Sequence, residues 1–194
     1  MKNQLLIIVL ALLTFTACKQ AETNEEANTE VEVTEEIVDN TATFEKRLGI
    51  LRAFIQGHSD ENLEAQASYF ADTLKWSSPS YSENPWQGKN ELMAVLKGYH
   101  DNFDNITYTE GITLPNNTGN GFFSGNVYAS DGTTVNSGGN AIRMYGTWNA
   151  THVESGKTVG VKFFSVASFN DDDKIAMMTD YWNVDGLAAQ LAEE

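Results

Sequence analysis

The sequence is short of the residues on which several kinds of protein chemistry depend. Its 194 residues include one cysteine, three histidines and three prolines, and 12 basic residues stand against 27 acidic ones. A single cysteine cannot build a disulfide framework, and three scattered histidines show no metal-ligand spacing. The net charge of −15 argues against a nucleic-acid partner, because binding to a phosphate backbone needs a basic surface.

Motifs of nucleotide and thiol chemistry are missing as well. The chain has no phosphate-binding loop, no GxGxxG fingerprint, no nucleophile elbow and no CxxC pair. The run Asp171–Asp173 lacks the spacing of a calcium loop and is better explained as a polar turn. We therefore expect no cofactor and no metal. With 41% hydrophobic residues the chain can still bury a core, which excludes full disorder.

An apolar segment near the start of the chain predicts export and a lipid anchor. Residues 5–17 form an apolar run behind Lys2 that is shorter than the roughly 20 residues needed to span a bilayer, and is typical of a signal peptide. The run ends in small residues before Cys18, a junction that resembles the lipobox of bacterial lipoproteins. The resemblance implies cleavage before Cys18, acylation of that cysteine with palmitate-type chains, and anchoring in the cell envelope, most simply in the outer membrane. The alternative is an ordinary secretory signal with a chance cysteine.

An acidic segment follows the apolar one. Residues 19–43 hold eight acidic residues, one lysine and no aromatic residue, so they cannot bury enough apolar surface to offset their ordering entropy. The alternative to a plain tether is that this stretch also acts as a surface-export signal. The predicted organisation is a signal peptide over 1–17, an acidic disordered tether over 18–43 and one folded domain over 44–194.

Periodicity in the remaining chain predicts helices first and strands afterwards. Apolar residues recur at helical spacing from Phe44, stop at Gly57 and His58, and resume in a second helix capped by Ser59 or Asp60. Further elements are a helix over 88–103, strands over 74–78, 106–114, 122–129, 142–153, 159–169 and 175–183, and a helix over 184–191. Helices followed by an antiparallel meander belong to the α+β class.

Several short motifs occur in the order that is found in one protein family. They are the turn and strand Asp173–Asp180, the stretch Gly186–Leu191, the hairpin formed by Tyr145–Trp148 and Ser155–Lys157, and the helix opening Trp86–Glu91. Together they resemble the SnoaL-like branch of the nuclear transport factor 2-like (NTF2-like) family over about residues 44–191. The resemblance implies a cone in which N-terminal helices pack on a strongly curved antiparallel sheet, with an apolar pocket in its mouth.

Asp180 is the candidate catalytic residue. Alternation along the last strand places Ala176, Met178, Asp180 and Trp182 on one face, and aspartate is disfavoured in strands. The position matches the cavity-facing acid of the family, and burial in an apolar pocket raises the pKa of a carboxyl until it can exchange protons. The alternative is a structural aspartate that bonds a loop or lies at a solvated strand end.

The chain departs from the characterised cyclases beside this acid. The resemblance implies that in those proteins the acid is paired with a histidine on the neighbouring strand. In this chain the neighbouring strand, 163–168, contains no histidine. Pairing through the turn at 171–173 predicts Phe163 or Phe164 opposite Asp180, which is an apolar neighbour and no proton relay.

Aromatic residues dominate the predicted pocket. Tyrosine and tryptophan combine apolar area with a polar group, which suits ligand sites, although burial in the core is the alternative for each. The predicted pocket residues are Trp76, Tyr81, Trp86, His100, Tyr145, Trp148, Phe164, Met178 and Trp182. The loop 79–87 is expected over the entrance. His100 also fits a helix end or solvent, His58 a linker and His152 an exposed hairpin, while Arg143 would suit a ligand carboxylate if its strand face points inward.

The sequence favours a lipid-anchored envelope protein whose domain binds a small apolar or aromatic molecule. One alternative is a cofactor-independent, SnoaL-like enzyme of the isomerase, cyclase or dehydratase type that uses Asp180 as general acid or base. Another is an interaction module that forms a homodimer, since the open sheet face of this fold commonly does so. Contact with the membrane is expected through the lipid anchor alone.

Overall fold

The protein is seen in a computed structural model that describes residues 39–111, 121–124 and 139–192. The predicted signal peptide, the lipidation site Cys18 and most of the predicted tether lie outside the described residues, as does most of the strand predicted over 122–129. None of the helices within these ranges is both long and apolar enough to pass through a membrane.

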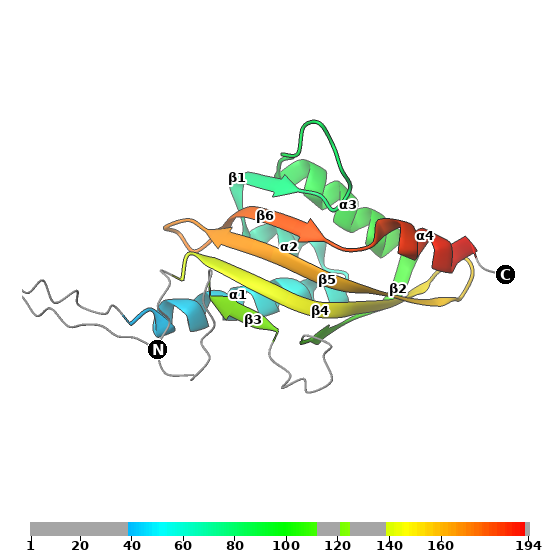
Figure 1. Cartoon of the computed structure of the whole chain (residues 1–194), viewed down its shortest axis with the longest axis horizontal. Helices are drawn as coiled ribbons and strands as arrows, with labels where there is room; N and C mark the ends of the chain where they lie inside the picture. The colour runs from blue at the N-terminus through cyan, green and yellow to red at the C-terminus, as the bar shows by residue number, and fades with distance from the viewer. Residues whose placement is uncertain (1–38, 112–120, 125–138, 193–194) are drawn as a thin grey trace, which may run out of the picture. The chain divides into compact units, whose positions relative to one another are not determined.

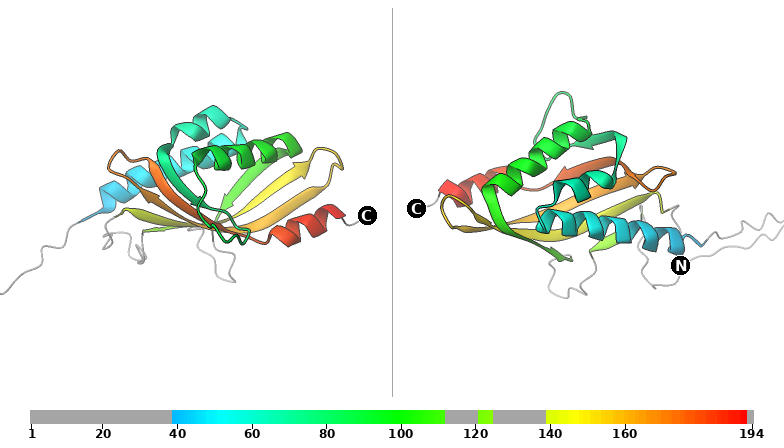
Figure 2. Two further views of the ribbon diagram at one scale, coloured as in Figure 1. Left: turned by 90° about the horizontal axis from the view of Figure 1, so that it is seen from above. Right: turned by 180° about the vertical axis from the view of Figure 1, so that it is seen from behind.

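In the described chain, the three N-terminal helices pack on one face of a curved sheet, and the C-terminal helix lies apart from them beside the sheet (Figures 1 and 2). The elements run in the order α1 (Thr41–Ser59), α2 (Leu63–Ser68), β1 (Phe70–Ser77), α3 (Lys89–Asn102), β2 (Phe103–Glu110), β3 (Phe122–Ser124), β4 (Ala141–His152), β5 (Thr158–Phe169), β6 (Ile175–Tyr181) and α4 (Val184–Ala192). Strands are ordered β1-β6-β5-β4-β2, and β3 pairs with β4. The predicted α+β class is confirmed.

The first helix is longer than the sequence pattern predicts. It continues through Gly57 and His58 to Ser59, and the side chain of Asn62, not Ser59 or Asp60, caps α2 by accepting a hydrogen bond from the Ala65 N–H. Gly57 does not end α1. It lies where an added Cβ would meet the Cγ of Gln66 at 3.1 Å, so the missing side chain lets α2 approach closely.

The sheet is mixed, whereas the sequence pattern predicts a purely antiparallel one. β1 begins at Phe70, four residues before the strand predicted over 74–78, and pairs in parallel with β6, so that the first and last strands are neighbours. The other pairings are antiparallel. A parallel partner for β1 becomes available because the chain passes through α3 and four strands before it returns as β6.

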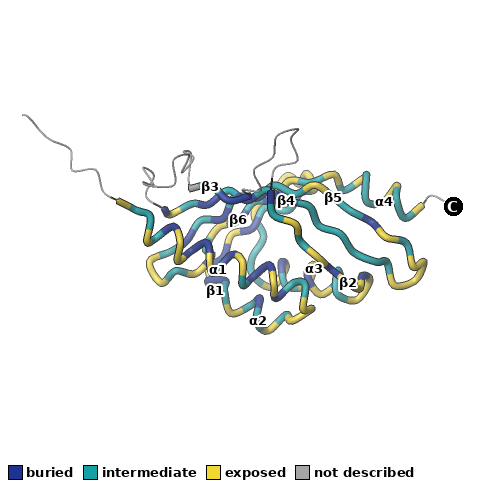
Figure 3. The backbone as a smooth tube through the Cα atoms, turned by 90° about the horizontal axis from the view of Figure 1, so that it is seen from below, coloured by how far each residue is buried: buried dark blue, intermediate teal, exposed yellow. Residues whose placement is uncertain are grey.

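The core fills the space between α1 and the inner face of the sheet, where buried residues gather in Figure 3. Leu51, Ile142, Met144 and Ile175 are almost fully buried there. Burial of apolar side chains of this size stabilises a fold by about 1.5–3 kcal/mol each. This packing holds β4, β5 and β6 in the arrangement that shapes the pocket described next.

Candidate active site in the pocket between helices and sheet

A pocket of about 120 Å³ lies between the helices and the inner face of the sheet. Its apolar wall includes Phe54 and Ile55 of α1, Leu92 and Leu96 of α3, and Phe163 of β5. Four polar or titratable residues besides the tryptophans also line it, namely His58, Tyr99, Asn149 and Asp180. An apolar cavity with a few polar groups is the usual form of a small-molecule site.

Asp180 is held in this pocket by the sheet itself. It lies on a rung of three inward-facing residues, Met144 on β4, Ser165 on β5 and Asp180 on β6. The residue is 7% exposed, and its Oδ2 accepts a hydrogen bond of 2.8 Å from Nε1 of Trp76 on β1. Among the described residues, Oδ1 of Asp180 has no hydrogen-bond partner. One carboxyl oxygen is thus held by Trp76, while the other has no hydrogen-bond partner within these residues.

Burial makes Asp180 a weak acid. Loss of solvent raises its pKa from 3.8 to about 6, and the nearby side chains of Trp76 and Ser165 oppose that rise. The Ser165 hydroxyl is close enough to act on the carboxyl but lacks the geometry of a hydrogen bond, so Trp76 is the partner that orients it. A carboxyl with a pKa of about 6 can both accept and donate a proton near neutral pH.

The predicted neighbour of Asp180 was wrong by one residue. Ser165 lies opposite Asp180, and Phe164 lies opposite Tyr181. The shift comes from an irregularity between Ser168 and Phe169 near the β5–β6 turn, which moves the pairing by one position. Since a step of one residue changes the face on which a side chain lies, a small polar group, and not an aromatic ring, comes next to the acid.

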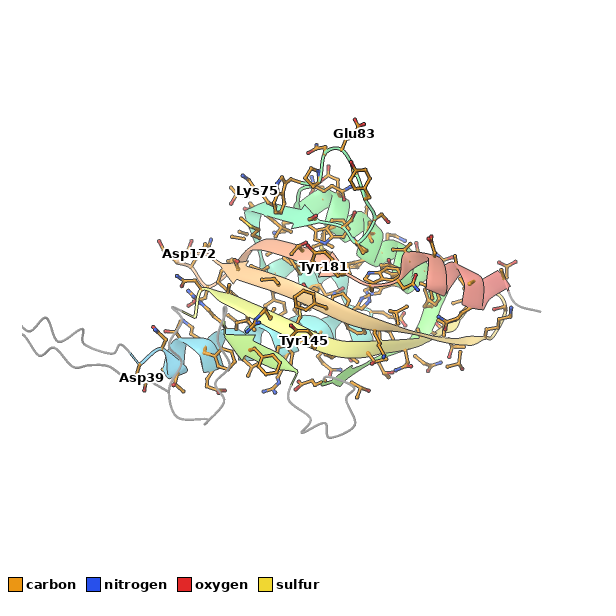
Figure 4. The ribbon with its side chains drawn as sticks, viewed as in Figure 1. Asp39, Lys75, Glu83, Tyr145, Asp172 and Tyr181 are labelled. Carbon is orange, nitrogen blue, oxygen red and sulfur yellow. The ribbon has the colours of Figure 1, made fainter. Side chains whose placement is uncertain are left out.

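The pocket takes in some of the predicted residues and leaves others out. Trp76, Trp148, Met178 and Trp182 line it together with Asp180. Tyr145 and Phe164 lie on the opposite face of the sheet, where their rings stack at 4.7 Å, and Phe164 stacks on Tyr181 at 5.7 Å. Figure 4 shows Tyr145 and Tyr181 on the sheet face turned away from the helices. Arg143 shares this outer face, with its guanidinium over the ring of Phe123, so it is not directed at the pocket.

The loop after β1 contributes fewer residues to the pocket than the sequence predicted. Tyr81 is 94% exposed and Trp86 44% exposed, and neither lines the pocket, although Pro79 of the same loop does. The hydrogen bonds between Trp76 and Gln87 close the loop at its base. This leaves its tip, which carries Glu83 in Figure 4, projecting away from the sheet.

Two residues that the sequence reading passed over lie in the pocket. His58, expected in a linker, belongs to the last turn of α1, and its Nδ1 is 2.8 Å from Nε2 of His100. His100 itself does not line the pocket and lies behind His58. Tyr99 of α3 lines it too, and burial followed by the charge of Asp180 raises the pKa of Tyr99 to about 12. A histidine placed four residues after Phe54 and three after Ile55 was the available signal, because helical spacing puts it on the same inward face.

Solved structures show which fold this is. A candidate isomerase from Bacillus subtilis is similar, with a TM-score of 0.58 and 16% identity, covering 78% of this chain and 96% of that one. A candidate SnoaL-like polyketide cyclase from Shewanella denitrificans gives 0.52 and 9%, covering 77% and 98%. An NTF2-like protein of unknown function from Burkholderia pseudomallei gives 0.51 and 14%, covering 76% and 98%.

These likenesses establish the NTF2-like fold that the sequence motifs indicated, with SnoaL-like polyketide cyclases among the structural neighbours. No protein-family model matches the sequence, and no curated protein matches it either. At these identities the likeness extends to the fold alone, and this fold hosts unrelated functions. Function must therefore be argued from the pocket.

Proposed function

We propose that the pocket binds a small, largely apolar or aromatic molecule that carries a carbonyl group, and that Asp180 moves a proton on it. The activity would be a cofactor-independent isomerisation or elimination of the SnoaL-like type. The observation that carries this proposal is the buried carboxyl whose Oδ2 is fixed by Trp76 and whose Oδ1 has no partner in the part of the chain that the structure describes. An unpaired buried oxygen costs about 1–3 kcal/mol, and a bound molecule that contacts Oδ1 would offset that cost.

The proposed step is a proton transfer next to the carbonyl. Oδ1 of ionised Asp180 takes a proton from the carbon beside the carbonyl, the C–H bond breaks, and its electron pair moves to the carbonyl oxygen as an enolate. The neutral Asp180 then returns the proton to a carbon of the same molecule and the electron pair moves back. A pKa of about 6 suits both halves, because neither form of the carboxyl is strongly favoured near neutral pH.

Hydrogen–deuterium exchange tests this role without knowledge of the natural substrate. A panel of aryl methyl ketones, with 2-acetylnaphthalene as its first member, is incubated with the protein in D₂O at pH 8, and loss of the methyl C–H signal is followed by NMR. We expect catalysed exchange to fall by a factor of 10² or more in Asp180→Asn. Asp172→Asn, an exposed carboxyl in the β5–β6 turn, is the matched control and should exchange like the unchanged protein.

Two results would contradict the proposal. Equal exchange in Asp180→Asn and the unchanged protein would remove Asp180 from the chemistry. Ketones that bind without any catalysed exchange would leave the binding of a small apolar molecule as the function, which is the simpler role that the sequence favours.

We further propose that this domain is carried on an envelope lipoprotein. The support is the Cys18 junction and the acidic segment behind it, which are features of the sequence.

A further inference from the structure

A second pair of polar side chains reaches the pocket from the helical side. His58 is in the last turn of α1 and lines the pocket, and His100 is in the last turn of α3. Their rings are joined by the hydrogen bond between His58 Nδ1 and His100 Nε2 at 2.8 Å. Rings of Trp148 and Tyr99 pack edge-on against His58 at 4.9 and 6.2 Å, so its orientation is fixed.

Both rings are uncharged at neutral pH. Burial first, and then the neighbouring His100, lowers the pKa of His58 to about 3. Burial also lowers the pKa of His100, although the charges of Glu61 and Asp101 oppose this and that of Lys97 adds to it. The hydrogen bond therefore joins two neutral imidazoles, each with one N–H.

A bond of this kind permits two arrangements of protons. In one, His58 Nδ1–H donates to His100, which leaves His58 Nε2 bare and puts the other proton of the pair on His100 Nδ1. In the other, His100 Nε2–H donates to His58, which puts the proton of His58 on Nε2 and leaves His100 Nδ1 bare. The tautomers of the two rings are therefore coupled. Surroundings that favour one tautomer of either ring also set the tautomer of the other.

The surroundings of His100 favour the second arrangement. Its Nδ1 is buried and has no hydrogen-bond partner among the described residues. A proton there would be a buried donor without an acceptor, and orphaned buried N–H groups are rarer than acceptors that lack a partner. The proton therefore belongs on Nε2 of His100, and His58 carries its own proton on Nε2.

Within the described ranges, the hydrogen bond to His100 is the one that the His58 ring makes, so its Nε2–H has no acceptor in hydrogen-bond geometry there. The side chain of Gln66 on α2 lies near enough to His58 to oppose the fall in its pKa, but neither Gln66 amide atom has a hydrogen bond of good geometry within the described parts of the chain. The ring lines the pocket, so a bound molecule can contact it.

We propose that His58 donates a hydrogen bond from Nε2 to an oxygen of the bound molecule, and that His100 is a positioning residue that fixes the tautomer. This inference rests on the proposed function and adds a second group to it. Asp180 acts from the sheet and His58 from the helices. A neutral imidazole N–H stabilises the negative charge that develops on a carbonyl oxygen during proton abstraction.

The tautomer can be read directly by NMR. The full chain contains three histidines, so ¹⁵N-histidine labelling gives three rings, with His152 of the β4–β5 hairpin as a reference. At pH 8 we expect His58 and His100 both to carry hydrogen on Nε2. Hydrogen on Nδ1 of both rings would overturn the proposal.

A matched pair of probes tests the donor itself. 2-Acetylnaphthalene and 2-isopropenylnaphthalene have nearly the same shape, but only the ketone has an oxygen that accepts a hydrogen bond. Binding is measured at pH 8, where Asp180 is ionised and cannot donate. We expect the unchanged protein to prefer the ketone about fivefold, which corresponds to one neutral hydrogen bond.

Variants assign that preference to one group. His58→Phe keeps a ring and removes the donor, so the preference should fall to about one, while His152→Phe should retain it. His100→Phe frees the tautomer of His58 and should reduce the preference without abolishing binding. Tyr99→Phe removes the competing pocket hydroxyl, and loss of the preference there but not in His58→Phe would overturn the proposal.

The outcomes separate this inference from the proposed function. Ketone and alkene that bind equally well to the unchanged protein would overturn the role of His58 and leave Asp180 untouched. Failure of both probes to bind would overturn the proposed binding function and the role of His58 with it. A ketone preference that depends on His58, together with exchange that does not depend on Asp180, would support His58 and reject Asp180 as the base.

Discussion

At the scale of single residues, the pocket contains one charge that the fold would be more stable without. Asp180 is 7% exposed and accepts one hydrogen bond among the described residues, from Trp76. Its pKa is raised because the charged form is poorly solvated. Natural sites often keep a group of this kind for its reactivity and lose stability in return.

We expect Asp180→Asn to stabilise the protein at pH 8 and not at pH 4. The pKa of Asp180 rises on folding from 3.8 to about 6, so the folded state binds more protons in that window and the stability is lost as pH rises through 6. Above that pH the penalty is on the order of 2–3 kcal/mol, and an amide avoids it. Urea unfolding at the two pH values measures the difference.

The control for this prediction is Asp172→Asn, which changes an exposed carboxyl and should shift stability equally little at both pH values. The low pKa of His58 lowers stability as pH falls below 6.5, but it does so in all three proteins and cancels in the comparison. A variant Asp180→Asn that is less stable than the unchanged protein at pH 8 would show that the carboxylate is well solvated.

At the scale of elements, α1 is attached to the far end of the sheet by one buried guanidinium. Arg47 donates to the carboxylate of Asp173 at 2.8 Å, the backbone carbonyl of Gly139 at 3.0 Å and the side chain of Asn140 at 2.8 Å. These partners lie at the β5–β6 turn and at the start of β4. The contact holds the helix that carries His58 against the strands that carry Asp180.

Arg47→Met should lower stability far more than Lys46→Met. Both residues pair with Asp173, but the Arg47 side chain is 8% exposed and that of Lys46 is 66% exposed. Loss of Arg47 leaves buried acceptors such as the Gly139 carbonyl unpaired, at about 2 kcal/mol. Lys46→Met removes a solvated ion pair and should change the free energy of unfolding by about 0.5 kcal/mol or less. Equal effects in thermal unfolding would contradict this account.

Two of the strands show what sequence periodicity can and cannot predict about the face on which a side chain lies. Alternation along β6 correctly groups Met178 and Asp180 on the inner face, because that strand has no irregularity between them. The same rule, applied strictly to β4, separates Tyr145 from Trp148, since they are three residues apart and lie on opposite faces. Only one of the two could therefore line the pocket, and the structure puts Trp148 there.

Other parts of the site depend on contacts that no local pattern records. The end of α1 was misplaced because Gly57 serves a close helix contact, which becomes visible once α2 lies against it. The pairing of His58 with His100 joins residues 42 apart. The register of β5 against β6 depends on an irregularity at one turn, and this decides that Ser165 faces the acid.

At the scale of the whole molecule, a lipid anchor would confine the pocket to a membrane surface. The prediction depends on Cys18, the sole cysteine of the chain. We expect the protein, expressed in a bacterium fed radiolabelled palmitate, to carry the label, and Cys18→Ser to carry none and to leave the membrane fraction. Because the folded domain contains no cysteine, this substitution should not change its thermal stability. Unlabelled protein that is released from the cell would indicate an ordinary secretory signal.

The parallel pairing of β1 with β6 also bears on how the protein matures. The hydrogen bond that orients the carboxyl joins residues 104 apart in the chain, and β6 is the last strand to leave the ribosome. Contacts of such long range form late, because the intervening chain must first be ordered. Until β6 docks, Asp180 is solvated, and its carboxyl keeps the ordinary pKa of 3.8. A chain that lacks β6 would therefore lack the buried, weakly acidic carboxyl on which the proposed proton transfer depends.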